Sequence, residues 1–156
     1  MLSDIIDENL IQLRVSSTDW EDAIRKSAYP LFKNGKITAS YIDAMIDNVK
    51  EAGPYIAITK HVALPHARPQ DGAKEIALAI STLEKPVNIG NKDNDPIKYI
   101  FCLSALDNDS HIQAMSQLVK LLEKNEFYNI LDKAKNPKEV MEYIRKHEQI
   151  ENKNKK

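Results

Sequence analysis

The chain has 156 residues, of which 42% are hydrophobic and 29% charged, and its formal net charge is −1 at pH 7. This length and composition predict one soluble globular domain, and the small net charge argues against a nucleic-acid or anionic-membrane partner. The opening MLSDIIDENL lacks the features of a secretory signal, and no apolar run approaches the roughly 20 residues of a membrane-spanning helix. A single cysteine, Cys102, leaves no internal disulfide, so we expect a cytoplasmic protein.

The first third of the chain predicts one strand followed by two helices. Apolar residues alternate along Asn9–Ser17, which is typical of a strand. Thr18–Glu21 has the Thr-x-x-Glu form of a capping box, so we expect a helix to begin there and to end at Asn34–Gly35. A second helix is expected to begin after Thr38 and to end at Gly53–Pro54.

The middle of the chain has the pattern of β-strands. Four short runs are rich in apolar or β-forming residues, and several are continuous, as in strands that are buried on both faces. The runs are Tyr55–Ile58, Val62–Leu64, Ile76–Thr82 and Ile97–Leu106.

After the last of these runs the helical spacing returns in three apolar stripes. The stripes are Ile112, Met115, Leu118 or Val119, and Leu122; then Phe127, Ile130, Leu131 and Ala134; then Val140, Met141 and Ile144. Helices on both sides of a central group of strands predict a three-layer α/β sandwich, in which a sheet is covered on both faces.

Four histidines are candidates for chemistry, and the alternative for each is an exposed or hydrogen-bonded side chain without a chemical role. His147 lies at the end of the last predicted helix, where the helix dipole favours a cation. His61 and His66 are separated by roughly 16 Å in an extended chain, and their side chains point to opposite faces. No Cys, Asp or Glu lies within KHVALPHA to complete the three or four ligands of a zinc site, so we expect no metal.

His66 lies just past the carboxyl end of a predicted buried strand. Pro65 ends this strand because proline fixes φ and cannot donate to a ladder. Ligands collect at this edge of open α/β sheets. Arg68, two residues on, can offer bidentate donors to an oxyanion such as phosphate. The alternative is a turn histidine beside a solvated arginine.

His111 follows the carboxyl end of the last predicted strand, in the segment DNDSHIQ. Ser110 and Gln113 form a Ser-x-x-Gln capping box, which predicts Ser110 as the N-cap and His111 as the first helical residue. The free N–H groups at a helix start disfavour an imidazolium but favour a phosphoryl group, so Ser110 joins Arg68 as a candidate phosphate-binding residue. His66 and His111 could therefore meet at one sheet edge, although His111 could also be an exposed residue of the first turn.

Two histidines, an arginine and a helix start suit reversible phosphoryl transfer through histidine. A neutral imidazole is the nucleophile, and surrounding donors stabilise the phosphoramidate. The sequence has no Walker motif, only four glycines and no GxSxG elbow, which argues against a nucleotide site and a serine hydrolase. We therefore expect no cofactor and a phosphoryl donor that is another protein.

Two stretches carry a family resemblance: GPYIAITKHVALPHARPQDG (53–72) and NDPIKYIFCLSALDNDSHIQAMSQLVKLL (94–122). They resemble the enzyme IIA (EIIA) component of the bacterial phosphoenolpyruvate-dependent sugar phosphotransferase system, of the mannitol–fructose type (type 2) and within it the ascorbate-specific subgroup. The resemblance implies an α/β/α sandwich with a mixed, mostly parallel central sheet. It implies a single domain over residues 1–147, which leaves 148–156, ending in ENKNKK, as a polar tail that we expect to be disordered.

The resemblance also implies a function and a set of roles. His66 would accept a phosphoryl group at Nε2 from the phosphocarrier HPr and pass it to a cysteine of the cognate enzyme IIB (EIIB), which serves the membrane component EIIC in the uptake of ascorbate or a related sugar. His111 matches a second active-site histidine that hydrogen-bonds the phosphoryl group. Tyr41 matches an active-site tyrosine. Asn48 stands where the mannitol type has an arginine, and we hypothesise that Arg68 supplies the missing charge.

Two other functions remain open. A freestanding EIIA-like protein could be a regulator whose phosphorylation state controls partner binding, although the sequence shows no DNA-binding segment of a fused regulator. A hydrolase could use His66 and His111 as general acid and base, but neither motif contains a paired carboxylate or a nucleophile.

Overall fold

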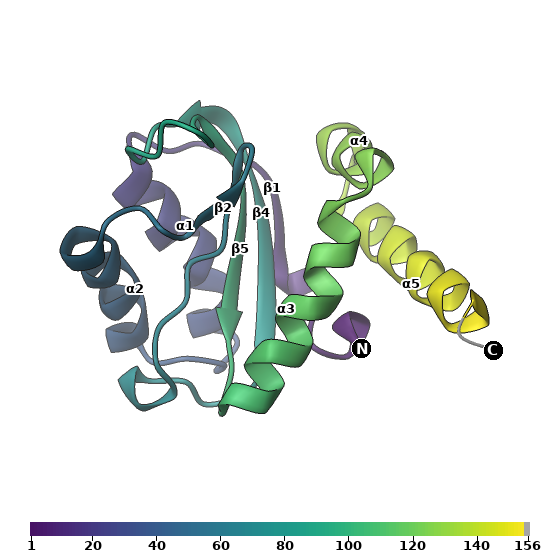
Figure 1. The fold of residues 1–156 in the computed structure, drawn as a ribbon, viewed down its shortest axis with the longest axis horizontal. Coiled ribbons are helices and arrows are strands. Elements are labelled where there is room, and N and C mark those ends of the chain that lie inside the picture. The colour runs from purple at the N-terminus through teal and green to yellow at the C-terminus, as the bar shows by residue number, and fades with distance from the viewer. Residues whose placement is uncertain (155–156) are drawn as a thin grey trace.

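The computed structural model describes residues 1–154, in which one five-stranded sheet lies between two layers of helices (Figure 1). The strands are β1 (Ile11–Val15), β2 (Ala57–Thr59), β3 (Val62–Ala63), β4 (Ala77–Val87) and β5 (Ile97–Ser104), in the order β1-β4-β5-β3-β2. The pairs β1–β4 and β3–β5 are parallel, whereas β4–β5 and β2–β3 are antiparallel. The predicted three-layer sandwich with a mixed sheet is confirmed, but parallel pairing does not predominate, because β4 turns back directly into β5.

Helices cover both faces of the sheet, with α1 and α2 on one side and α3, α4 and α5 on the other (Figure 1). Their bounds are α1 Trp20–Lys33, α2 Ala39–Ala52, α3 Asn108–Leu122, α4 Asn125–Lys133 and α5 Pro137–Asn154, and short 3₁₀ turns occupy Leu2–Asp4, Glu8–Leu10 and Pro69–Asp71. Along β5, Ile100 and Cys102 enter the α1–α2 core, while Phe101 and Leu103 enter the core on the opposite face. Both faces are buried, which explains why this strand is a continuous apolar run.

The starts of α1 and α3 differ from the sequence prediction. The N-cap of α1 is Asp19 rather than Thr18, because the Asp19 carboxylate accepts the N–H of Asp22 at 2.8 Å. The N-cap of α3 is Asp107, which makes Ser110 the third helical residue and not the cap. Aspartate caps helices at least as well as serine or threonine, so a nearby aspartate displaced the predicted residue in both cases.

The predicted stripe of α3 and the predicted tail also differ from the structure. Ile112 is 63% exposed, whereas Leu118 and Leu122 of the predicted stripe are buried, and Ala114 and Leu121 complete the inward face of α3. Residues 148–154, expected to be disordered, continue α5, and the Glu148 carboxylate accepts the backbone N–H of Ser3 at 2.8 Å and its hydroxyl at 2.6 Å. Residues 155–156 of that tail lie outside the described residues. Within residues 1–154, no helix combines the length and apolarity needed to cross a membrane.

Candidate active site

The two candidate histidines lie together at one edge of the sheet. β3 and β5 are parallel, and the chain beyond β3 continues alongside β5, where the N–H of Leu103 donates to the carbonyl of Pro65 at 3.1 Å. His66 follows this segment, and His111 lies in the first turns of α3, the helix that follows β5. Their ring centroids are 5.3 Å apart, with an angle of 51° between the ring planes. The structure therefore brings the two histidines together, as the strand order suggests.

The His66 ring has a fixed orientation. Its Nδ1 lies 2.8 Å from the carbonyl oxygen of Leu64. A carbonyl can only accept, so in the neutral ring Nδ1 carries the hydrogen and Nε2 keeps the lone pair. The half-buried ring thus offers Nε2 as a nucleophile, and the bond to Leu64 stabilises that tautomer.

His111 is a neutral neighbour of His66. Burial, together with the charge of His66, lowers the pKa of His111, so the imidazole is uncharged near pH 7. Its Nε2 is buried and has no hydrogen-bond partner within residues 1–154. A buried polar atom without a partner is costly, and the ring that carries it lines the pocket beside His66.

The Tyr41 hydroxyl anchors the loop that carries His66 through hydrogen bonds to the backbone. The residue is fully buried, and its hydroxyl accepts the N–H of Ala67 at 3.1 Å and donates to the carbonyl of Leu103 at 2.9 Å. Burial raises the pKa of Tyr41 to about 12. The hydroxyl therefore ties the residue after His66 to the end of β5. Because no part of the side chain reaches the surface, Tyr41 positions the loop and does not present a group to a ligand.

An open pocket of about 250 Å³ lies beside the two rings. It is lined by Asn48, His66, Ala67, Arg68, Pro69, Ala105, Asp107, Asn108 and His111. Asn48 reaches it from α2, and its Nδ2 lies 3.5 Å from the carbonyl oxygen of His66, at the outer limit of a hydrogen bond. The pocket has room for a phosphoryl group and is open to solvent, so a second protein could approach His66.

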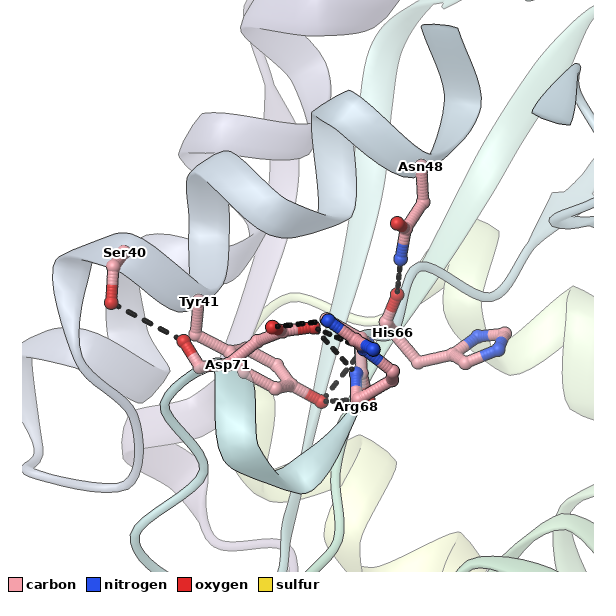
Figure 2. Close-up of polar contacts among 7 residues, drawn as sticks. Ser40, Tyr41, Asn48, His66, Arg68 and Asp71 are labelled. Carbon is pink, nitrogen blue, oxygen red and sulfur yellow. Dashed lines mark hydrogen bonds and ion pairs between the residues drawn. The ribbon is translucent and has the colours of Figure 1, made fainter. Parts of the chain in front are cut away.

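Arg68 lines this pocket, but its guanidinium contacts Asp71 (Figure 2). The Nε and Nη2 atoms lie 3.4 Å from Oδ2 and 3.3 Å from Oδ1 of Asp71, respectively. Figure 2 shows the His66 ring extending away from this pair. Hydrogen bonding to Arg68 lowers the pKa of Asp71, which keeps the carboxylate ionised near neutral pH.

The structure does not bring Ser110 into the pocket. Its N–H donates to the Asp107 carboxylate at 2.8 Å, and its hydroxyl is 3.2 Å from the Asp107 carbonyl oxygen. The N–H of Ser110 also lowers the pKa of Asp107, so the start of α3 carries its own anion. The expectation that Ser110 binds phosphate has no contact to support it. The sequence prediction missed Asp107 and Asn108 as lining residues because it placed the cap at Ser110, and Asp and Ser are both favoured at that position.

The chain is similar to proteins of one family along nearly its whole length. Residues 4–147 match the family model of the phosphoenolpyruvate-dependent sugar phosphotransferase system, EIIA 2. The ascorbate-specific PTS system EIIA component of Shigella boydii is 31% identical over 145 residues, which is 92% of this chain and 94% of that protein. A putative phosphotransferase IIA component of Escherichia coli is 34% identical over 79% of this chain and 84% of its own.

Solved structures agree with these sequence relatives. The mannitol-specific cryptic phosphotransferase enzyme IIA of Escherichia coli is 38% identical and superposes with a TM-score of 0.81, over 92% of this chain and 97% of that one. The mannitol enzyme IIA of Escherichia coli has a TM-score of 0.77 at 23% identity, over 89% and 98% of the two chains, and it shows the shared fold. The chain is therefore a member of the type 2 EIIA family of the phosphoenolpyruvate-dependent sugar phosphotransferase system, a family of phosphotransferase components.

Proposed function

We propose that His66 is the phosphorylation site of a sugar-transport phosphocarrier that works in the cytoplasm. The Nε2 lone pair attacks the phosphorus of phospho-HPr, and the bond between phosphorus and the HPr histidine breaks. In the second step a cysteine thiolate of EIIB attacks the same phosphorus, and the bond to His66 Nε2 breaks. The observation that carries this proposal is the 2.8 Å contact from Nδ1 to the Leu64 carbonyl, which leaves Nε2 as the nucleophilic atom.

The relatives favour transport of ascorbate, or a related sugar, as the physiological role. Relatives named as ascorbate-specific EIIA components are 28–31% identical over at least 90% of this chain. A solved complex of mannitol enzyme IIA with phosphorylated mannitol enzyme IIB from Escherichia coli contains a chain that superposes with a TM-score of 0.77 at 22% identity, over 89% of this chain and 96% of that one. We extend this to a cognate EIIB as acceptor here, with EIIC as the membrane component. The nitrogen regulatory protein IIA-Ntr of Neisseria meningitidis also superposes with a TM-score of 0.77, at 19% identity, which reflects the shared fold alone. The relatives named for ascorbate are 28–31% identical, and we therefore place transport before the regulatory alternative.

The neighbouring side chains would act on the phosphoryl oxygens. Neutral His111 can donate a hydrogen bond without repelling a cation, and Arg68 can supply the charge that Asn48 lacks. We expect Arg68→Ala to slow transfer from phospho-HPr by more than about tenfold. A rate within twofold of wild type would show that Arg68 does not stabilise the phosphoryl group during transfer.

Phosphorylation in a reconstituted system tests the proposal. The wild type, His66→Ala and His111→Ala are each mixed with phosphoenolpyruvate, enzyme I and HPr, and the intact mass is measured. The wild type should gain one acid-labile phosphoryl group, which His66→Ala abolishes and His111→Ala only slows. No gain in the wild type would contradict the proposal. Addition of a candidate EIIB then separates transport, in which the group moves on, from a regulatory role, in which it stays.

A further inference from the structure

The Arg68–Asp71 pair closes the short turn that follows His66. One carboxylate oxygen of Asp71, Oδ2, accepts the backbone N–H of Arg68 at 3.1 Å and its Nε at 3.4 Å, while Oδ1 accepts Nη2 at 3.3 Å. The side-chain contacts are longer than the 2.7–2.9 Å of a strong charge-assisted bond. The Arg68 side chain is also 72% exposed. Breaking the ion pair between Arg68 and Asp71 therefore costs little free energy.

Asp71, in contrast, is held in place. Its carbonyl accepts the hydroxyl of Ser40 at 3.2 Å, and the N–H of Thr38 donates to the carbonyl of Gly72 at 2.9 Å (Figure 2 shows Ser40 and Asp71). A Cβ at Gly72 would lie 2.0 Å from Thr38 Oγ1, so the turn packs directly against the start of α2. The Asp71 side chain is 21% exposed and its Oδ2 also accepts the backbone N–H of Arg68, so the longer and more exposed arginine side chain is the partner better able to move away.

Once His66 is phosphorylated, the pocket needs the positive charge of Arg68. Arg68 lines the pocket with His66 and His111, whereas Asp71 does not. Asn48 contributes a neutral amide, and Asp107 contributes a negative charge. A phosphoryl group on Nε2 adds close to two more negative charges and has the oxygen geometry that a guanidinium binds in bidentate fashion.

We propose that the Asp71 carboxylate holds the Arg68 guanidinium away from His66 while His66 is unphosphorylated. When His66 is phosphorylated, the phosphoryl group replaces Asp71 as the partner of the guanidinium. Asp71 is thus a positioning residue that competes with the phosphoryl group for one cation. By this competition it lowers the stability of the phosphorylated form and favours onward transfer. The inference rests on the proposed function, because it requires a phosphoryl group on His66.

Asp71→Asn tests the competition. The asparagine keeps an acceptor for the backbone N–H of Arg68 but removes the charge that pairs with its side chain. The equilibrium constant for transfer from phospho-HPr should rise about two- to fivefold, the range expected for loss of an exposed ion pair. Glu75→Gln is the control, since Glu75 is likewise a carboxylate paired with a cation (Lys36 Nζ, 2.8 Å), although its side chain is more exposed, and it does not line the pocket. It should leave the constant unchanged.

A double-mutant cycle separates this role from a structural one. In an Arg68→Ala background, Asp71→Asn should have no effect on the equilibrium constant, because the arginine that it holds is absent. The inference is overturned if Asp71→Asn does not raise the constant, or if it raises it equally with and without Arg68. Either result leaves phosphorylation of His66 intact. If the wild type takes up no phosphoryl group, the proposed function fails, and this inference fails with it.

Discussion

Replacement of Tyr41 by phenylalanine removes one hydroxyl from beneath the His66 loop and keeps the ring volume. The lost hydroxyl accepts from Ala67 at 3.1 Å and donates to Leu103 at 2.9 Å. Each of these two backbone groups then loses a partner in a buried region, and an unsatisfied buried group costs about 1–3 kcal/mol. We expect Tyr41→Phe to lower the free energy of unfolding by about 2 kcal/mol. It should also slow the phosphorylation of His66, because Ala67 is the next residue.

Urea unfolding at pH 7 measures the free energy, and thermal melting gives an independent readout. A loss of about 2 kcal/mol corresponds to a fall in Tm of about 4–8 °C for a chain of this size. Tyr29→Phe is the control, since Tyr29 is 52% exposed on α1 and its change should stay within about 0.5 kcal/mol. If the free energy of unfolding of Tyr41→Phe is also within about 0.5 kcal/mol of the wild-type value, the hydroxyl does not hold the loop.

Two further predictions concern the turn and the second histidine. Gly72→Ala should destabilise the protein more than Gly35→Ala. Both glycines have positive φ (136° and 75°), but only at Gly72 would a Cβ contact Thr38. Equal urea midpoints for the two variants would refute this prediction. The pKa of His111 is lowered in the folded state, so the unfolded chain binds more protons below about pH 6.5. The free energy of unfolding of the wild type, relative to that of His111→Gln, should therefore decrease as the pH is lowered from 8 to 5.5. A difference between the two proteins that stays constant over this range would contradict the prediction.

The parts of the site that depend on neighbouring residues were predictable from sequence. Pro65 ends a buried run and leaves His66 at the carboxyl edge, and the apolar run of β5 leads directly into the helix that carries His111. The parallel pairing of β3 with β5 then brings the rings to 5.3 Å. Such features follow from strand period and from proline chemistry.

The parts that depend on distant or competing contacts were not predictable. The hydroxyl of buried Tyr41 hydrogen-bonds the carbonyl of Leu103, which lies 62 positions later in the chain. Helix formation by residues 148–154 accompanies a contact between Glu148 and Ser3 at the other end of the chain. Asp107 and Ser110 can both cap a helix, and only the backbone geometry decides between them.

The atom that carries the phosphoryl group tests the central claim most directly. The chain is labelled with ¹⁵N in its histidine rings and phosphorylated by phospho-HPr, and correlated ³¹P–¹⁵N NMR identifies the phosphorylated nitrogen. The bond from Nδ1 of His66 to the Leu64 carbonyl predicts a signal from Nε2 of His66 alone. Phosphorylation at Nδ1 of His66, at His111 or at no histidine would contradict the account.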